Sequence, residues 1–347
     1  MPGSASVALE DDPRPALCDL ARGLFRGERD SEPDLLANEP PNPWRGLGDF
    51  GQGGQGMMGG TPYGRMMPMP PQADLRDGLM LDAYTATVGP FLPTLPPGLV
   101  LEVTWQGDII QSARLVRVPF EPPRDAAAPF HRALSEPGSI SVLERIRAAN
   151  HLRCLAHVLE LLELHRLARR CRRTAVQAIT GETIDVARLM RAVRRSGALA
   201  AAPPGLGRLP EEVAAEIGGV ARRAGGKPVD VRARQREYAD LGFEPITHAG
   251  GDVRARLLQW MEEAEQAVKL AEHARLRERV RFAHAVESPW GPLPATGHYE
   301  PSETGFDFTD LLVGCEWLEA MLVVASFDVA ALARMTPRSP DPGLGEP

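Results

Sequence analysis

Three side chains on one predicted helix are of types that bind metals. His151, Cys154 and His165 recur at steps that place them within about 60° of one another around a helix, and His157 lies further round. Imidazole and thiolate are common zinc ligands. No carboxylate stands in an obvious register to orient them, and histidine or cysteine on a helix flank is usually a packing residue. We therefore expect no metal at this position.

The other soft ligands give no metal motif either. The methionine-rich stretch 57–69 could offer thioethers to Cu(I), but its low-complexity composition explains the methionines without a ligand. The sequence contains no CxxC pair, and its cysteines are too scattered for a disulfide framework. They are Cys18, Cys154, Cys171 and Cys315. A phosphate-binding loop, a GxSxG elbow and a paired-carboxylate motif are also missing from the sequence.

Arginine carries nearly all of the positive charge, since Lys227 and Lys269 are the only lysines. Many arginines fall between Arg145 and Arg195. The planar guanidinium group of arginine can donate two hydrogen bonds to one carboxylate. These clusters therefore predict either a contact with an acidic partner or subunit, or a solvated helix face. The formal net charge of −7 argues against a chain whose main task is to coat nucleic acid.

Composition divides the chain into a tail and a body. Residues 1–77 are rich in Pro, Gly and Met, which predicts a disordered tail with one short helix near Ala16 to Phe25. Residues 78–335 are expected to form a single body, and 336–347 a second disordered end. The acidic start has no apolar h-region, and the longest apolar run is far below the ~20 residues of a membrane span. We expect a cytoplasmic chain.

The predicted fold class is α+β, a small antiparallel β region followed by a bundle of long helices. Residues 78–118 should form three strands, with a hairpin at Gly107 and a stiff, ordered surface loop "GPFLPTLPPG" between the first two. Residues 139–279 should be helical, and 280–335 should close the body with a short strand pair and a buried helix. The predicted helices are 139–173, 174–196, 210–224 and a fourth that starts after Asp252, its cap.

Four stretches, in order, resemble the 49-kDa-type (D) subunit of NADH:quinone oxidoreductase, a family related to the large subunit of nickel–iron hydrogenases. "VGPFLPTLPPGLVLEVTWQGDIIQSA" is similar to the family's N-terminal strand region, and "RIRAANHLRCLAHVLELLEL" to one of its long helices. "VESPWGPL" and "AMLVVASFDV" are similar to its closing segment. The most specific match is 238–273, where Gly251-Asp252 and Met261-Glu262-Glu263 stand at the family's spacing. The resemblance covers most of residues 80–330 and implies a hydrogenase large-subunit-like scaffold.

The resemblance also implies where a site would lie. The equivalent of the family's quinone loop contains Pro90, Leu92, Pro93 and Gly98, and Leu92 stands where the family has a histidine that positions the quinone headgroup. Proton delivery to a reduced quinone needs a titratable donor, which leucine cannot supply. The matched positions on the helices and in the closing segment are Arg153, His157, Gly251, Asp252, Glu262, Glu263 and Asp328.

Other residues that the family uses have no counterpart in the matched segments. The family's quinone-binding tyrosine is missing from residues 118–137, and its histidine near the terminal iron–sulfur cluster is missing between Thr174 and Arg195. Both CxxC pairs that hold the metal in hydrogenases are missing as well. Three histidines could substitute but are expected at the surface, namely His248, His284 and His298.

Three roles are compatible with this pattern. The leading expectation is a structural or interaction component of a redox complex of the NADH:quinone oxidoreductase or hydrogenase type, with a degenerate quinone site and no catalysis by the isolated chain. The alternatives are an active quinone-site subunit with unfamiliar residues, and an accessory or assembly factor. The resemblance implies a small-subunit partner that carries an iron–sulfur cluster, quinone as the ligand of the complex, and peripheral attachment to the cytoplasmic face of a membrane.

Docking of that partner is expected around the Pro-rich loop and the long helix. In such an interface we expect three apolar side chains to be buried against the partner, namely Phe91, Leu92 and Leu95. We expect this chain to bind no cofactor itself and no nucleic acid.

Overall fold

The structure, a computed structural model, describes residues 14–28, 83–120, 124–274, 279–294 and 305–335. The chain divides into two units, Met1–Asp82 and Ala83–Pro347, and each is described by itself. The described part of the first unit contains α1 (Arg14–Phe25), which confirms the short helix predicted near Ala16. Most of the predicted disordered tail, with its methionines, and the predicted disordered end 336–347 lie outside the described residues. The predicted domain limits stay predictions.

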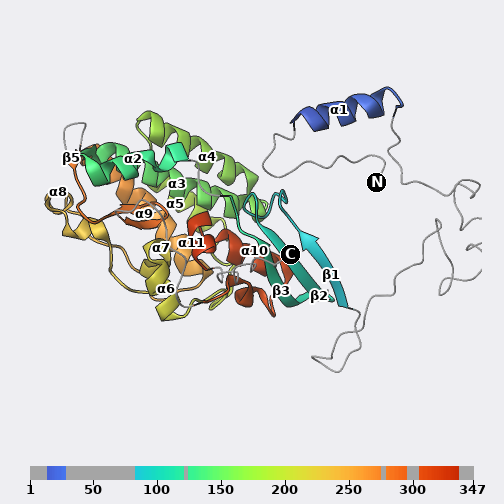
Figure 1. The fold of residues 1–347 in the computed structure, drawn as a ribbon. Helices are drawn as coiled ribbons and strands as arrows, with labels where there is room; N and C mark the ends of the chain where they lie inside the picture. The colour runs from blue at the N-terminus through green and yellow to red at the C-terminus, as the bar shows by residue number, and fades with distance from the viewer. Residues whose placement is uncertain (1–13, 29–82, 121–123, 275–278, 295–304, 336–347) are drawn as a thin grey trace, which may run out of the picture. The chain divides into compact units, whose positions relative to one another are not determined.

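The second unit begins with a three-stranded antiparallel sheet. Its strands are β1 (Ala83–Val88), β2 (Val100–Gln106) and β3 (Ile109–Arg117), in that order across the sheet (Figure 1). β2 and β3 form the predicted hairpin, and Gly107 supplies a positive φ of 63° at its turn. Leu101, Val103 and Ile110 are fully buried on the inner face of the sheet. The alternation of apolar and polar residues therefore fixes which face of the sheet covers the core.

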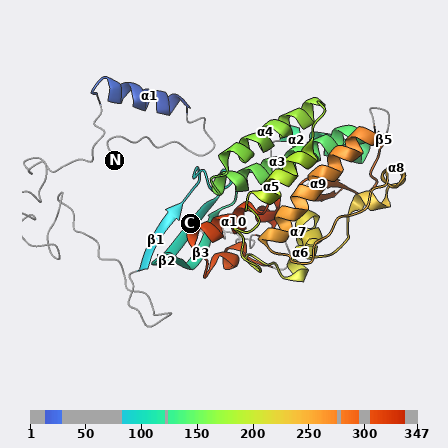
Figure 2. The ribbon, with the colours of Figure 1, turned by 180° about the vertical axis from the view of Figure 1, so that it is seen from behind.

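Long helices pack side by side behind this sheet (Figures 1 and 2). They are α3 (Ile140–Leu161), α4 (His165–Thr180), α5 (Val186–Arg195) and α9 (Val253–Ala274). α9 begins where it was predicted, because the Asp252 carboxylate accepts the backbone N–H of Ala255 at 2.9 Å and caps the helix. The shared interior of this layer is apolar, which holds the four helices together.

The prediction of one unbroken helix over 139–173 is wrong. The chain reverses between α3 and α4, where Glu163 has a positive φ of 59°. Leu162 and Leu164 on either side of it pack against the helical core, and the small residues of α4 then lie against α3. An apolar pattern that continues through a reversal does not reveal the reversal, because both helices contribute to the same core.

Two further predicted helices are each divided in the structure. The predicted helix 174–196 is interrupted after Thr180, and Asp185 caps α5 by accepting the backbone N–H of Arg188 at 2.8 Å. The predicted helix 210–224 is divided into α6 (Glu211–Ile217) and α7 (Gly219–Ala224). Gly219 has a φ of 55°, and a Cβ on it would lie 2.7 Å from the Cα of Gly291. The close approach of the chain at Gly291 therefore determines this break.

Short elements complete the unit. The predicted strand pair is confirmed as β6 (Ala285–Ser288) and β7 (Gly291–Pro294), and the predicted closing helix is two helices, α10 (Trp317–Ala325) and α11 (Val329–Arg334). The others are α2 (Arg124–Ser135), β4 (Gly138–Ser139), η3 (Val231–Arg234), α8 (Arg236–Asp240), β5 (Arg279–Val280) and η4 (Phe308–Leu312).

The core consists of three apolar clusters. One joins the sheet to α6, α7, α10 and α11, a second fills the space among α3, α4, α5 and α9, and a third lies around α2, α8 and the short strands. The predicted α+β class is confirmed. Within the described residues, every helix is too short or too polar to cross a lipid bilayer.

Candidate functional site

The loop between β1 and β2 is ordered by its own backbone. The Gly98 N–H donates to the Pro90 carbonyl at 3.0 Å, and the Phe120 N–H donates to the Pro97 carbonyl at 2.9 Å. Gly98 has a φ of 89°, and a Cβ on it would lie 2.7 Å from the backbone nitrogen of Phe120. The chain after β3 therefore closes over the loop, and the predicted ordered loop is confirmed.

The apolar side chains of this loop divide between surface and core. Phe91 is 63% exposed, Leu92 is half-buried against the core, and Leu95 is only 2% exposed. Pro93 is exposed and Pro90 is half-buried. The prediction that Phe91, Leu92 and Leu95 together anchor a partner is wrong for Leu95, because its side chain lies inside the main apolar cluster. Of these three apolar side chains, that of Phe91 is the most exposed to solvent.

α3 brings an imidazole to this loop. His157 hydrogen-bonds to the backbone of Thr94, and burial is the main cause that lowers the pKa of His157 below its ordinary value of 6.5. Its Nε2 atom and the Thr94 hydroxyl are buried without a hydrogen-bond partner among the described residues. His157 is therefore mostly neutral at pH 7 and a weak proton donor. Residues 89–99 themselves contain no ionisable side chain.

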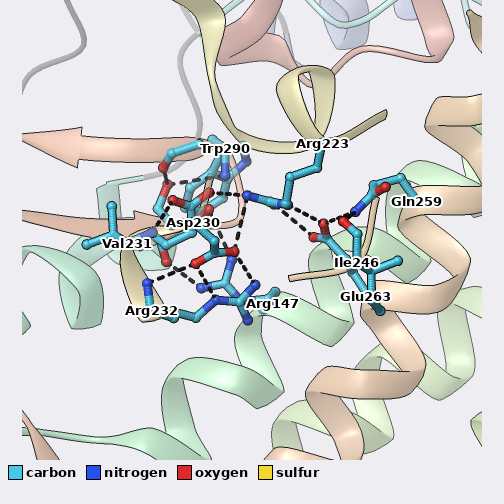
Figure 3. A network of polar contacts seen from close by, with 12 residues as sticks. Arg147, Arg223, Asp230, Val231, Arg232, Ile246, Gln259, Glu263 and Trp290 are labelled. Atoms are coloured by element: carbon cyan, nitrogen blue, oxygen red, sulfur yellow. Dashed lines mark hydrogen bonds and ion pairs between the residues drawn. The ribbon is translucent and has the colours of Figure 1, made fainter. Parts of the chain in front are cut away.

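A second polar site is a network of charged side chains inside the body (Figure 3). Arg223, on α7, lies at its centre, 1% exposed. Its Nε is 2.6 Å from a carboxylate oxygen of Glu263, and its Nη1 is 2.7 Å from Glu287 and 3.2 Å from Asp230. One guanidinium therefore joins α9, β6 and the segment before η3, which are far apart in the sequence.

Two more buried arginines extend the network. Arg232 lies 2.8 Å from Asp230 and 3.0 Å from Glu144, and Arg147 lies 3.2 Å from Glu144. Glu144 also accepts a hydrogen bond of 2.8 Å from the Tyr238 hydroxyl. Arg147 donates to the backbone carbonyls of Glu287 and Ser288, which fastens β6 to α3. These contacts fix the orientation of several elements at once.

The charges of the network nearly balance. Three guanidiniums face four carboxylates, and burial raises the pKa of Glu287, which can therefore hold the balancing proton. Burial would also raise the pKa of Glu263, but Arg223 and His151 hold it well below its ordinary value of 4.5. The His151 Nε2 lies 3.1 Å from Glu263 without the alignment of a hydrogen bond, and burial lowers the pKa of His151.

Sequence reasoning missed most of this network. It identified Glu263 by its match to the family, but it did not identify Arg223, Arg232 or Asp230. A usable signal was present on α3, where Glu144, Arg147 and His151 recur at the same three- and four-residue steps as the buried leucines. Charged residues at core positions of an apolar period must be paired inside the protein, because a lone buried charge is too costly.

Comparison with known proteins identifies the scaffold. The family model for the respiratory-chain NADH dehydrogenase 49 Kd subunit matches residues 181–287. The chain is similar to a 49-kDa-type subunit. A chain in the structure of the membrane-bound sulfane sulfur reductase, an archaeal respiratory membrane complex, has the same fold with a TM-score of 0.51 at 15% identity. The match covers 73% of this chain and 99% of that chain. None of the proteins of curated function matches this sequence.

The positions matched to the 49-kDa-type family do not form one site. Glu263 lies in the buried network, whereas Glu262 faces outward, 3.3 Å from Arg194. Asp328 is buried and caps α11 through the N–H of Ala331 at 2.9 Å, and burial raises its pKa. Arg153 is exposed on α3. The loop and His157 are the two matched parts that lie together.

Two matched positions support the start of α9. Gly251 has a φ of 63°, in the left-handed region where glycine is favoured. Asp252 accepts the N–H of Gly205 at 2.9 Å as well as that of Ala255. Gly251-Asp252 therefore shapes the helix start and has a structural role.

Two of the three substitute histidines lie among the described residues, and neither hydrogen-bonds to the loop. The His248 Nε2 lies 3.3 Å from the carboxylate of Glu262, on the outward side of α9. His284 is exposed. His298 lies outside the described residues. The contacts of His248 and His284 therefore give no support to a proton donor at the loop from either position.

The histidine and cysteine side chains noted on one predicted helix face are divided between two helices in the structure. His165 begins α4 and pairs with Glu160 at 2.8 Å, while His151 lies in the buried network. Burial raises the pKa of Cys154 and of Cys171 to about 12, which disfavours the thiolates that a nickel–iron site needs. No group of three His, Cys, Asp or Glu side chains that could hold a metal occurs within the described residues.

Proposed function

We propose that this chain is a 49-kDa-type subunit of a respiratory-type redox complex that acts through its surfaces and has a degenerate quinone site. The observation that carries the proposal is the loop of residues 89–99. It contains no ionisable side chain, Leu92 packs against the core, and His157, which meets the loop at Thr94, is buried with a lowered pKa. Such a loop can shape an interface but is a poor source of protons.

The fold supports membership of a complex. The solved chain with the same fold comes from a structure described as a respiratory membrane complex, and nearly all of that chain is matched. We propose that the partner is a small subunit that bears an iron–sulfur cluster and that it attaches this chain to the membrane. The cluster and the quinone would belong to the assembled complex rather than to this chain.

Phe91 is the side chain that best tests docking at the loop, because it is 63% exposed. The experiment is native affinity purification of the full-length chain, followed by identification of co-purifying iron–sulfur proteins. Phe91→Asp should fold normally and lose the partner, since a central apolar anchor typically contributes ~1 to 4 kcal/mol to binding. Val229→Asp, at an exposed apolar residue outside the loop, is the control and should retain the partner. Equal retention by both variants would refute docking at the loop.

A second function is favoured by one observation. The buried Nε2 of His157 and the hydroxyl of Thr94 lack partners among the described residues, as polar groups awaiting a ligand would. In an active quinone site His157 would be the polar group beside the headgroup. Quinone reduction by the purified complex, abolished by His157→Gln with the partner retained, would establish this alternative. Leu92→His alone should create no activity, because the tyrosine of the family is also missing.

A further inference from the structure

The outer sides of α4 and α5 carry a dense set of arginines, here called the basic face. On α4 it consists of Arg166, Arg169, Arg170 and Arg173, and on α5 of Arg188, Arg191 and Arg195. All seven side chains are exposed. The buried residues of α4 are on the opposite side of the helix, at Ala168, Cys171, Ala175 and Ala178. Helical spacing therefore directs both sets of arginines away from the core.

These arginines have no carboxylate to balance them. Residues 165–195 contain nine arginines and only two carboxylates, in a chain whose formal net charge is −7. Arg172 pairs with Glu160, and Arg194 pairs with Glu262 and Glu265. The seven arginines of the basic face form no ion pair with any other described residue. Like charges at three- and four-residue steps of one helix repel one another, so an external anionic surface would stabilise this face.

The shape of the face indicates what kind of surface fits. The α4 arginines run from Arg166 to Arg173, which corresponds to about 10 Å of helix, so they form a stripe two turns long. Val176 and Ile179, both exposed aliphatic residues on the same helix, flank that stripe. Two short basic stripes on α4 and α5, one of them bordered by aliphatic side chains, are suited to the phosphates and glycerol region of a bilayer surface.

We propose that the basic face binds anionic phospholipid headgroups and holds this chain directly against a membrane surface. This goes beyond the proposed function, because it needs neither the Pro-rich loop nor the iron–sulfur partner. Each basic side chain near an anionic bilayer contributes modestly, and seven together are sufficient for reversible binding. The fold match to a chain from a membrane-bound complex is consistent with the proposal.

The test is sedimentation of full-length protein with vesicles of phosphatidylcholine containing about 30 mol% phosphatidylglycerol, beside pure phosphatidylcholine vesicles. The protein should bind the anionic vesicles and not the neutral ones. Binding should weaken steeply between about 0.1 M and 1 M salt, because surface charges are screened. No binding to anionic vesicles at low salt would overturn the proposal.

The variant Arg169→Glu/Arg170→Glu/Arg173→Glu should weaken vesicle binding on the order of 100-fold. The control Arg132→Glu/Arg234→Glu/Arg254→Glu makes the same change in net charge at exposed arginines elsewhere and should bind within about threefold of wild type. Circular dichroism checks that both are folded. Equal losses in the two variants would mean that only net charge matters, and the face would carry no site.

Lysine substitution identifies the kind of anion. Arg169→Lys/Arg170→Lys/Arg173→Lys keeps the charge and should keep vesicle binding within about twofold, because bilayer attraction depends on charge. A loss as large as that of the glutamate variant would show that planar, bidentate contacts matter, as with carboxylates of a protein partner, and would overturn the lipid assignment. Tighter binding to single-stranded polyuridine than to anionic vesicles would overturn it in favour of nucleic acid.

Discussion

The loop of residues 89–99 and the buried charge network show two opposite uses of polarity in one scaffold. The loop has an apolar side chain, Leu92, at the position where the resemblance implies a quinone-binding histidine, and it folds Leu95 into the core. The network keeps seven charged side chains in the interior and pairs every guanidinium with a carboxylate. Charged side chains are therefore present in the network, where they join helices and strands. They are missing from residues 89–99, where the resemblance implies that a quinone would need a proton donor.

This contrast explains how the chain can keep the fold of the matched subunit while its loop lacks a proton donor. The network connects α3, α7, α9 and β6, so its residues determine how the helical layer is arranged. The loop connects two adjacent strands, and it contributes apolar side chains to the core but no charged residue to the network. Fold and site chemistry are thus separable in this molecule.

The largest effect is expected from removing the centre of the network. Arg223→Met should lower the free energy of unfolding by about 3 to 5 kcal/mol, because three buried carboxylates lose their shared partner. Chemical denaturation measures the change. Arg194→Met is the control, since Arg194 also contacts two carboxylates but its side chain is 36% exposed, and it should cost less than about 1 kcal/mol. Similar costs would show that burial does not distinguish the two arginines.

The network should also give a specific dependence on pH. The pKa of Glu263 is held well below 4.5 in the folded chain, so its ionised form stabilises the fold above the unfolded pKa, and this contribution is lost as pH falls through the folded value. The stability difference between wild type and Glu263→Gln should therefore be constant near neutral pH and shrink below about pH 4.5. Denaturation at a series of pH values tests it, and a difference independent of pH would contradict the assignment.

A smaller effect is expected at the loop. Gly98→Ala should cost about 1 to 3 kcal/mol of stability, because φ is 89° and the new Cβ would lie 2.7 Å from the Phe120 backbone. Gly197→Ala is matched in φ, at 86°, but its Cβ would have no neighbour within 4 Å. Denaturation of both variants separates backbone strain from the close approach. Equal costs would mean that the contact with Phe120 contributes nothing.

The smallest effect concerns His157. Its pKa lies below 6.5 in the folded chain, so the unfolded chain binds more protons as pH falls below 6.5, and folding loses stability over that window. His157→Gln should remove this loss, so the variant should lose less stability than wild type as pH falls below 6.5. An NMR titration should place the midpoint of the imidazole below 6.5, and a midpoint above that value would show that the site favours the cation.

The sequence predicted regular elements better than their ends. The hairpin at Gly107 and the cap of α9 by Asp252 follow from local chemistry, and both are confirmed. The breaks at Glu163 and Gly218 were missed, because each depends on what packs against the turn from a distant part of the chain. Local periodicity reports which face is apolar and not where the helix must turn.

The sequence by itself determined the α+β class, the resemblance to the 49-kDa-type family and the composition of the loop, because strand and helix periods, motif spacing and residue type are local properties. Tertiary structure alone decided that Arg147, Arg223 and Arg232 share carboxylates from four separate segments, and that His157 meets Thr94. It also decided that Leu95 is buried while Phe91 is exposed. Burial and pairing depend on which distant residues occupy the neighbouring space, and that is fixed only when the chain packs.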